Sequence, residues 1–191
     1  MTMTNSEILS IFRQSGALLE GHFQLTSGLH SPQYFQCAKV LQYPRYMEQL
    51  CGEIAANFRE RRVEVVIAPA LGGIVVGQEV GRQLGARTLF TERKEGTMQL
   101  RRGFEIRSGE RVLVCEDVIT TGGSVGEVIR IVTGSGGAVV GVAAIVDRSG
   151  GKAPFENMFA TMTMSVLAYK QEDCPLCKGG SAPEKPGSRA N

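Results

Sequence analysis

The sequence predicts an α/β protein in which helices flank a central parallel sheet, and three observations support this fold class. Short apolar runs at residues 63–68, 111–115 and 138–146 are typical of strands that are buried on both faces of a sheet. Segments with the apolar spacing of a helix, at 73–84 and 124–132, alternate with these runs. The repeated order of strand, helix and strand favours parallel pairing through right-handed crossovers. We therefore expect functional residues beyond the carboxyl ends of the strands, where such sheets bind ligands.

The N-terminal part of the chain is expected to be less regular. Residues 5–15 predict a short helix with an apolar stripe, which Gly16 can end. Residues 17–42 are mixed in character and rich in turn-forming residues. Pro44 then lies near the start of a helix that has one buried face.

Two later segments are expected to be mobile. After a strand at residues 87–92, residues 97–106 alternate only in part between apolar and polar residues. This alternation is centred around residues 101–103, and we interpret the segment as a mobile hairpin inserted between two core strands. Residues 179–191 are rich in Gly, Pro, Ser and Lys, a composition typical of a flexible tail.

Composition limits the possible classes of protein and partner. A chain of 191 residues that is 42% hydrophobic can form one domain with a substantial core. A net charge of +2 is too small to argue for nucleic acid or a membrane surface as a partner. No apolar run approaches the roughly 20 residues of a membrane span, and the N-terminus lacks the regions of a signal peptide. We expect a cytoplasmic protein with neither a nucleic-acid nor a membrane partner.

The cysteines argue against a disulfide framework, because the chain has five of them, an odd number. Cys174 and Cys177 have the CxxC spacing of a zinc-ligand pair, but no second pair accompanies them. His22 and His30 are remote in sequence. We therefore expect a structural or incidental pair and no metal ligands. The alternative is a metal site that is completed across a dimer.

The most informative segment is residues 112–124, Val-Leu-Val-Cys-Glu-Asp-Val-Ile-Thr-Thr-Gly-Gly-Ser. An apolar strand ends at Glu116 and Asp117, whose carboxylates can accept hydrogen bonds from sugar hydroxyls or face a Mg²⁺ ion. Hydroxyl groups and glycine N–H groups follow where the next helix starts, and there the helix dipole attracts phosphate. The segment predicts a sugar site beside a phosphate site. No Gly-Lys-Ser/Thr occurs in the chain, which excludes a P-loop.

This segment resembles the phosphoribosyl pyrophosphate (PRPP) motif of the type I phosphoribosyltransferases: four apolar residues, two acids, two apolar residues, then Thr-x-Gly-x-Ser/Thr. The resemblance implies their fold, in which N- and C-terminal segments form a small hood over the sheet and a hairpin loop is mobile. It implies one domain at residues 1–178, with the hood at about 1–42 and 150–178 and the core at about 43–149. The PRPP-binding residues that it implies, including two from the turn after the first core strand, are Glu116, Asp117, Val118, Ile119, Thr120, Thr121, Gly122, Gly123, Ser124, Leu71 and Gly72.

Other residues resemble the catalytic loop of the orotate phosphoribosyltransferases in this family. Arg93-Lys94 matches the pair that opens that loop, which closes over pyrophosphate. The forked guanidinium and the compact ammonium both suit oxygen anions. The usual loop continues with a further Lys and a His, which are missing here. Arg101 or Arg102 is a catalytic candidate to replace them, and the alternative is a solvated pair.

Two further cations that are common in these enzymes are absent from the chain. Leu71-Gly72 stands where many of them have Tyr-Lys. Thr26 stands where they often have Lys. The pyrophosphate half of the implied site is therefore the half in which this chain departs from its relatives.

The base-binding residues are implied by the same resemblance. Residues 23–35 are similar to the hood segment of the orotate enzymes, in which Tyr34 and Phe35 would stack on a flat pyrimidine ring. The alternative is that one or both belong to the core of the hood. Arg148 follows a strand end, at the position that binds the carboxylate of orotate, unless it pairs only with Asp147. Thr120 is expected to contact orotate as well.

The chain is thus identified as a member of the orotate phosphoribosyltransferases, in a subgroup with a short loop. The resemblance implies transfer of the phosphoribosyl group of PRPP to orotate, which gives orotidine 5′-monophosphate and pyrophosphate in de novo pyrimidine synthesis. It also implies Mg²⁺ that is bound mainly through PRPP, and a homodimer. One alternative is a phosphoribosyltransferase for another base, a purine or uracil. The other is a regulator with the PRPP fold that binds nucleic acid.

Overall fold

The computed structural model of the chain describes residues 2–25, 27–165 and 167–186. The helices and strands in these residues are, in chain order, α1 (Asn5–Gln14), β1 (Leu18–Gln24), β2 (His30–Phe35), α2 (Ala38–Leu41), α3 (Pro44–Phe58), β3 (Val65–Pro69), α4 (Gly72–Leu84), β4 (Arg87–Lys94), β5 (Thr97–Leu100), β6 (Arg111–Ile119), α5 (Gly123–Gly134), β7 (Ala138–Asp147), β8 (Met158–Thr163) and α6 (Pro175–Lys178).

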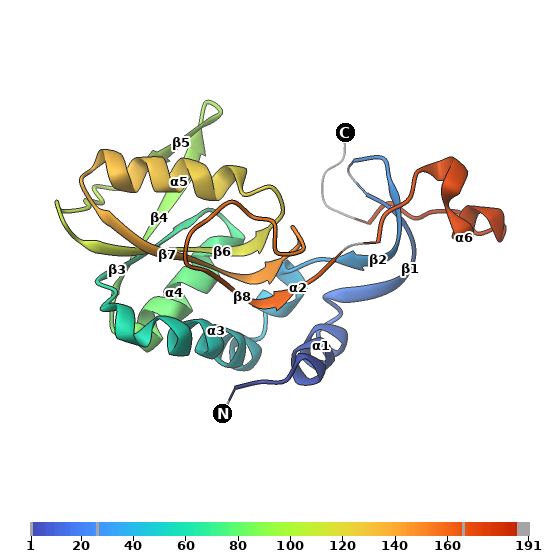
Figure 1. Cartoon of the computed structure of the whole chain (residues 1–191), viewed down its shortest axis with the longest axis horizontal. Helices are drawn as coiled ribbons and strands as arrows, with labels where there is room; N and C mark the ends of the chain where they lie inside the picture. The colour runs from blue at the N-terminus through green and yellow to red at the C-terminus, as the bar shows by residue number, and fades with distance from the viewer. Residues whose placement is uncertain (1, 26, 166, 187–191) are drawn as a thin grey trace.

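The described residues form a central six-stranded sheet with the strand order β5-β4-β3-β6-β7-β8 (Figure 1). The strands from β4 to β8 pair in parallel along this order, and β5 pairs with β4 in the antiparallel sense. A separate two-stranded sheet, β1 with β2, lies to one side of the central sheet. The predicted fold class, a parallel sheet flanked by helices, is confirmed.

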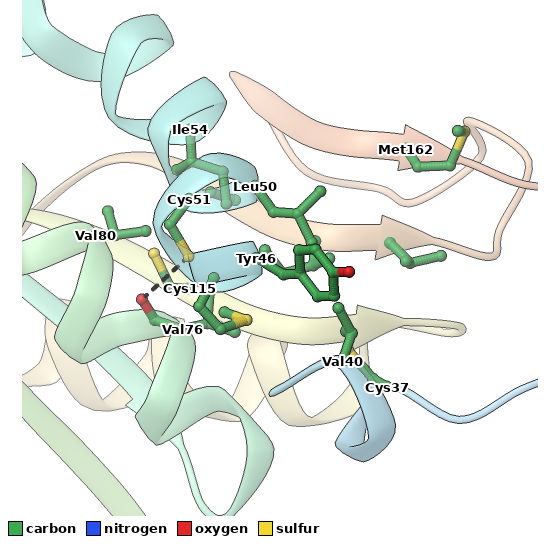
Figure 2. Packing of buried hydrophobic residues seen from close by; sticks show 14 of the residues in the cluster. Cys37, Val40, Tyr46, Leu50, Cys51, Ile54, Val76, Val80, Cys115 and Met162 are labelled. Atoms are coloured by element: carbon green, nitrogen blue, oxygen red, sulfur yellow. Dashed lines mark hydrogen bonds between the residues drawn. The ribbon is translucent and has the colours of Figure 1, made fainter. Parts of the chain in front are cut away.

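Helices cover both faces of the central sheet, with α3 and α4 on one face and α5 on the other (Figure 1). Figure 2 shows the cluster on the first face, in which Leu50 and Ile54 of α3 meet Val76 and Val80 of α4 and Cys115 of β6. All five side chains are buried. Because these strands are parallel, their carboxyl ends lie along one side of the sheet. The helices cover the faces, so polar side chains can be exposed at these strand ends.

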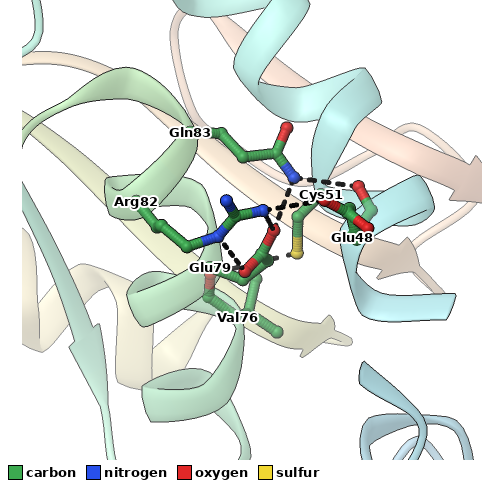
Figure 3. Close-up of polar contacts among 6 residues, drawn as sticks. All are labelled: Glu48, Cys51, Val76, Glu79, Arg82 and Gln83. Carbon is green, nitrogen blue, oxygen red and sulfur yellow. Dashed lines mark hydrogen bonds and ion pairs between the residues drawn. The ribbon is translucent and has the colours of Figure 1, made fainter. Parts of the chain in front are cut away.

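A polar contact joins α3 to α4 beside this cluster (Figure 3). Arg82 forms ion pairs with Glu79 at 2.7 Å and with Glu48 at 3.1 Å, and the Gln83 side chain donates to the Glu48 carbonyl oxygen at 2.9 Å. The Arg82 side chain is 56% exposed, so these ion pairs contribute little to stability. Apolar packing therefore sets the position of α4, whose first residues lie at the functional edge of the sheet.

The N-terminal region is more regular than the sequence predicts. Residues 17–42 contain the antiparallel hairpin of β1 and β2 and the short helix α2. The pairing register shifts between Glu20 and Phe23, which is a β-bulge, and the neighbours His22 and Phe23 are both buried. The bulge breaks the alternation of apolar and polar residues by which a strand is recognised in a sequence.

The segment at residues 150–178 does not belong entirely to the hood. It contributes β8, which pairs with β7 at the edge of the central sheet. β8 is partly exposed, and its apolar run of Met158, Phe159 and Ala160 is interrupted by two threonines, so its composition does not distinguish it clearly from a loop. The boundary between core and hood therefore differs from the predicted one at this end of the chain.

The hairpin consists of β4 and β5 and turns at Glu95 and Gly96, so it begins earlier than the predicted segment at residues 97–106. Glu95 and Gly96 have φ values of 52° and 80°, as the two central residues of a tight hairpin turn require. Glutamate rarely adopts a positive φ, so Glu-Gly is a weak turn signal. Residues 101–103 form a second turn, which follows β5.

The C-terminal segment returns to the N-terminal hairpin. Glu184 exchanges backbone hydrogen bonds with this hairpin: Gln24 N–H donates to its carbonyl oxygen at 2.7 Å, and its own N–H donates to His22 at 2.8 Å. The part of the predicted flexible tail that the structure describes, residues 179–186, is therefore anchored to the hairpin through Glu184. Residues 187–191 and Thr26 lie outside the described residues, so their predictions stay predictions.

The same return brings Cys174 and Cys177 next to His22 and His30, although the two histidines are remote from the cysteines in sequence. His30 exchanges two backbone hydrogen bonds of 2.8 Å with Tyr169, which directs the chain toward α6. Sequence distance concealed this cluster, because the backbone pairing that forms it joins the two ends of the chain. Among the described residues, no helix combines the length and hydrophobicity that a membrane crossing would need.

Candidate functional site

The residues of the sequence motif form a tight turn at the carboxyl edge of the central sheet. β6 continues past the two acids to Ile119, and α5 begins at Gly123. Gly122 has a φ of 78°, in the left-handed region that favours glycine. The ring of Phe155 lies where a side chain on Gly122 would be. Both the backbone conformation and the close packing therefore require glycine at this position.

A cavity of about 230 Å³ lies at this turn. Its walls are formed by Arg93, Glu116, Val118, Ile119, Thr120, Thr121, Gly122, Gly123, Ser124, Val125 and Glu127. Within the described part of the chain, the first helical amide with a backbone partner is that of Gly126, which donates to Gly122 at 2.8 Å. The amides just before it are therefore available to an anion, as at other helix starts. The structure thus brings most of the predicted motif residues together around one small polar cavity.

The turn after β3 packs directly against the two acids of the motif. A side chain on Gly72 would overlap the carboxylate of Asp117, and one on Gly73 would lie 3.0 Å from Glu116 Oε1. Only glycine allows the backbone to come this close to both carboxylates. Leu71 stands at the tip of this turn with 84% of its surface exposed. The starts of α4 and α5 therefore meet at one edge, with the acids between them.

The acidic pair is less negative than two separate carboxylates. Burial, together with the adjacent Asp117, raises the pKa of Glu116 to about 9. Asp117 N–H donates to Glu116 Oε1 at 3.0 Å, and Val118 N–H donates to Asp117 Oδ1 at 2.9 Å. Near neutral pH, the pair can therefore both donate and accept hydrogen bonds, which suits a diol such as ribose.

Arg93 lies at the wall of the cavity and is held there by Glu127. Its guanidinium contacts Glu127 Oε1 at 2.9 Å and donates to the Gly96 carbonyl oxygen at 2.8 Å. The second oxygen of Glu127 is buried and has no partner among the described residues. Glu127 was not among the site residues predicted from the sequence. The signal for it is its place three residues after Ser124, on the same face of α5.

The other loop cations do not line the cavity. Lys94 is exposed at the end of β4. Arg102 forms two hydrogen bonds of 2.8 Å with the carboxylate of Glu92, and Arg101 lies 3.9 Å from the same group. In this conformation of the loop, Glu92 holds both arginines at the base of the hairpin, away from the motif.

Arg148 lies beside the motif, on the neighbouring strand end. Its backbone N–H donates to the Ile119 carbonyl oxygen at 2.7 Å. Its guanidinium Nε is buried and has no partner among the described residues. Burial lowers the pKa of Arg148, and the nearby phenol of Tyr34 opposes this effect. A half-buried cationic group with a buried, unsatisfied donor atom is suited to an incoming anion.

Asp147 does not neutralise Arg148. Its carboxylate accepts hydrogen bonds from the Ser149 and Gly151 amides at 2.7 and 2.9 Å. No ion pair between Asp147 and Arg148 occurs in the described residues. The alternative interpretation, an arginine that pairs only with Asp147, is therefore wrong for this structure. Asp147 instead orders the loop that carries Arg148.

Tyr34 and Phe35 point to opposite sides of β2. Phe35 is 7% exposed and packs edge-on against Phe12, with 4.9 Å between the ring centroids. Its side chain belongs to the core, so the predicted stacking on a ligand is wrong for Phe35. Tyr34 is half-buried, tilts against Phe23 and lies near Arg148. Alternation along the strand leaves Tyr34 as the aromatic residue that can face a base.

A larger cavity of about 690 Å³ lies between α1 and α3. Glu7, Glu48 and Glu53 are among its walls, which contain no basic residue. Three acids without a cation would repel a phosphorylated ligand. The small cavity at the motif is therefore the better anion site, although it has the smaller volume.

Comparisons with known proteins agree with this geometry. The phosphoribosyl transferase domain family matches residues 40–168, which contain the motif and the turn after β3. The chain is 61% identical to the orotate phosphoribosyltransferase of Chlorobaculum parvum over 190 residues, which cover 99% of this chain and 98% of that protein. It is 56% identical to the orotate phosphoribosyltransferase of Heliobacterium modesticaldum, with 98% of this chain and 100% of that protein covered.

Solved structures resemble the chain in fold. Orotate phosphoribosyltransferase from Aeropyrum pernix superposes with a TM-score of 0.68 at 24% identity, covering 82% of this chain and 93% of that one. Adenine phosphoribosyltransferase from Rhodothermus marinus gives a TM-score of 0.65 at 21% identity, covering 84% and 100%. Enzymes named for different bases thus have this fold, so the fold alone does not identify the base.

Proposed function

The chain belongs to the phosphoribosyl transferase domain family and, within it, to the orotate phosphoribosyltransferases, and from this premise we propose how its residues divide the reaction between them. The enzyme transfers the phosphoribosyl group of PRPP to orotate, which gives orotidine 5′-monophosphate and pyrophosphate for pyrimidine synthesis. One observation carries the assignment of roles. A polar cavity at the start of α5 lies next to Arg148, whose backbone N–H donates to the carbonyl oxygen of the cavity residue Ile119. The guanidinium Nε of Arg148 is buried and has no partner among the described residues.

The turn at the start of α5 binds the 5′-phosphate of PRPP. Its amides have no helical partners, and the hydroxyls of Thr120, Thr121 and Ser124 stand around the same cavity. The helix dipole adds to the attraction for a phosphate dianion. Val118 and Ile119 shape the wall of this cavity, and Gly122 and Gly123 allow close approach.

Glu116 and Asp117 bind the ribose hydroxyls. The raised pKa of Glu116 lets the pair donate one hydrogen bond and accept others. The partly protonated pair also repels the polyanionic substrate less than two full charges would. The acidic pair lies between the turn at the start of α5 and the turn at Leu71-Gly72. The ribose of PRPP likewise lies between the 5′-phosphate and the pyrophosphate.

Pyrophosphate leaves beside the turn at residues 70–73, with Arg93 and Lys94 as its cationic contacts. Arg101 and Arg102 serve as further cations when the loop closes and releases them from Glu92. Carboxylate oxygens are ligands that Mg²⁺ prefers, and the Asp117 carboxylate faces the backbone of Gly72, so the site fits the ion. Bound mainly through PRPP, with Asp117 beside it, Mg²⁺ would neutralise charge on the departing pyrophosphate.

Orotate is held by Arg148, Tyr34 and Thr120. A forked guanidinium matches a planar carboxylate, and the phenol ring of Tyr34 can lie against the pyrimidine. No side chain acts as a nucleophile. The protein orients the base toward the anomeric carbon, and its fixed cations and dipoles stabilise the charge that develops as pyrophosphate departs. Closure of the β4–β5 hairpin would exclude water and so prevent hydrolysis of PRPP.

The proposal includes a cytoplasmic homodimer without nucleic-acid or membrane partners. The +2 net charge supports the absence of a nucleic-acid partner, because salt-dependent binding to phosphates needs many basic contacts. Size measurement of the purified chain at several concentrations tests the dimer.

A panel of bases tests the assignment of orotate. The purified chain with PRPP and Mg²⁺ is offered orotate, uracil, adenine and hypoxanthine, and both nucleotide and pyrophosphate are measured. We expect product from orotate alone at a substantial rate. Comparable turnover of uracil would contradict the role of Arg148, because uracil has no carboxylate. Absence of turnover with every base would favour a binding protein without catalysis.

A further inference from the structure

Four potential metal ligands from the two ends of the chain meet in the hood. His22 lies on β1 and His30 on β2, while Cys174 precedes α6 and Cys177 lies within it. One ligand atom from each residue can be chosen so that all four lie within 4.8 Å of one another. Three of the residues are buried, and Cys177 is half-buried. The cluster is distinct from the cavity at the start of α5, since none of the four residues lines that cavity.

Four of the six distances between the ligand atoms are close to the edges of a metal-centred tetrahedron, and the other two are below 4.8 Å. His22 Nε2 lies 3.0 Å from His30 Nδ1, 3.5 Å from Cys174 Sγ and 3.7 Å from Cys177 Sγ, and His30 Nδ1 lies 3.2 Å from Cys177 Sγ. Zinc bonds of about 2.0–2.1 Å to nitrogen and 2.3 Å to sulfur imply edges of about 3.3–3.8 Å. The observed distances lie within a few tenths of an ångström of this range.

Hydrogen bonding alone does not account for the arrangement. A neutral imidazole nitrogen carries either one proton or one lone pair, so His22 Nε2 cannot bond to three neighbours at once. The two cysteines are free thiols and form no disulfide with each other. Four donor atoms that surround one point, and that cannot all be joined by hydrogen bonds, are typical of a cation site.

The outer contacts fix His22 in the form that a metal requires. His22 Nδ1 lies 3.0 Å from the carbonyl oxygen of Ser181, to which it can donate its proton. The lone pair is then on Nε2, the atom that faces the other three residues. A hydrogen bond from the second ring nitrogen to a carbonyl oxygen is the usual partner of a metal-bound histidine.

The elements around the cluster are small, so a bound metal would stabilise them. The hood here consists of a two-stranded sheet and a helix of four residues, elements that are marginally stable alone. The β-bulge between Glu20 and Phe23 places His22 toward the cysteines. A bound metal would join β1 and β2 to the C-terminal segment, and its binding energy would add to folding.

We propose that His22, His30, Cys174 and Cys177 bind one zinc ion, which fastens the C-terminal segment to the N-terminal hairpin. Two imidazoles and two thiolates favour zinc over Mg²⁺ or Ca²⁺, which prefer oxygen ligands. Four protein ligands leave no open position for water or substrate, so the site is structural. It is separate from the Mg²⁺ that accompanies PRPP.

The metal content of the purified full chain tests the proposal. The protein is prepared in reducing buffer without chelator, dialysed against metal-free buffer and analysed by mass spectrometry for metals. We expect about one zinc per chain, as for other closed four-ligand sites. Replacement by Co²⁺ should give the absorption bands of tetrahedral cobalt together with thiolate-to-cobalt charge transfer. The cobalt spectrum uses the unaltered protein, so it does not depend on whether a variant folds.

Paired variants assign the ligands. Cys174→Ser with Cys177→Ser should abolish zinc and cobalt binding. Cys51→Ser is the matched control, because Cys51 is equally buried but lies between α3 and α4, where its thiol faces the Val76 carbonyl oxygen. It should retain the metal.

Three outcomes would overturn the proposal. The first is a reduced, folded chain that holds no zinc and takes up no cobalt. The second is full metal content in the double variant, which would place the ion elsewhere. The third is a Cys174–Cys177 disulfide in freshly purified protein. None of these outcomes requires a substrate, so the proposal can fail while the transferase activity stands.

Discussion

At the scale of single residues, the site depends on two ionisable groups that are costly to bury. Glu116 is kept partly protonated by burial beside Asp117, and Arg148 has a buried nitrogen without a partner. Residues in such states reduce stability and are typical of functional sites. Each therefore gives a prediction in which stability and activity respond differently.

Replacement of Glu116 by Gln should stabilise the free protein and impair the enzyme. The pKa of Glu116 is raised, so its contribution to stability is largest below the ordinary value of 4.5 and is lost as pH rises toward about 9. At pH 8, removal of the titrating group should raise Tm by about 2–4 °C, the shift caused by about 1 kcal/mol in a domain of this size. Turnover should fall by at least about tenfold through the lost ribose contact. Melting curves from pH 5 to 9 and steady-state rates measure both, and a variant that is less stable at pH 8 would contradict the raised pKa.

Replacement of Arg148 by Ala should affect orotate much more than PRPP. Loss of a charge-assisted contact worth about 1.5–3 kcal/mol should raise KM for orotate by about 10- to 100-fold. KM for PRPP should change by less than about threefold, because the motif turn is intact. Arg148→Lys is the control that keeps the charge and removes the fork. Equal effects on both substrates would exclude a specific carboxylate contact.

At the scale of elements, the turn between β6 and α5 is more constrained than its sequence suggests. Gly122→Ala would place a methyl group at positive φ and against the ring of Phe155. We expect a stability loss of about 1–3 kcal/mol and at least about tenfold weaker PRPP binding. Gly126→Ala, in α5 near the same turn, is the control, since only the end of the flexible Arg130 side chain comes within 4 Å of the added carbon. Chemical denaturation and PRPP titration distinguish the two variants.

Among the cations in and after the β4–β5 hairpin, Arg93 lines the cavity, whereas Arg101 and Arg102 pair with Glu92 away from it. Arg93→Ala should lower kcat by about 10²-fold, because Arg93 lies at the cavity wall. Arg102→Ala should lower it by less than about tenfold, since Arg102 reaches the site only after leaving Glu92. Stopped-flow single-turnover rates, with Tm as a control for folding, test the order. A larger effect at Arg102 would show that loop closure brings it to the reacting atoms.

The elements differ in how far the sequence could predict them. Apolar runs and helical spacing predicted the parallel strands from β3 to β7 and the helices between them, because burial on both faces leaves a strong pattern. The motif residues line the small polar cavity at the start of α5, and their role in binding phosphate stays a prediction. The hairpin of β1 and β2, the edge strand β8 and the turn at Glu95 were missed, because a bulge, a mixed composition and an unusual φ leave no periodic signal. Phe35 was misassigned because its direction depends on the register of β2.

At the scale of the whole molecule, the core and the hood have different sources of stability. The central sheet is covered by helices on both faces, whereas the hood depends on backbone pairing between the chain ends and on the His–Cys cluster. Such a division predicts that parts of the chain can open separately.

Removal of metal should therefore loosen the hood and leave the sheet intact. With a chelator, hydrogen exchange should rise in β1, β2 and residues 169–186, while β3, β6 and β7 stay protected. Activity should fall mainly through a higher KM for orotate, because Tyr34 lies in the hood. Uniform exchange over the whole chain would contradict a separate hood. Unchanged hydrogen exchange in β1, β2 and residues 169–186 would mean that metal binding at the cluster does not stabilise the hood.

The pairing of Glu184 with His22 and Gln24 also sets an order of events during protein synthesis. The strands and helices between residues 44 and 147 can assemble as soon as they leave the ribosome, since they need only each other. The β1–β2 hairpin emerges before this core, yet it must wait for Glu184 before the two backbone hydrogen bonds can anchor it. A nascent chain that stops short of Glu184 would thus carry the folded sheet without an anchored hairpin. Tyr34, which lies on that hairpin, would take its final position only after residue 184 has been synthesised.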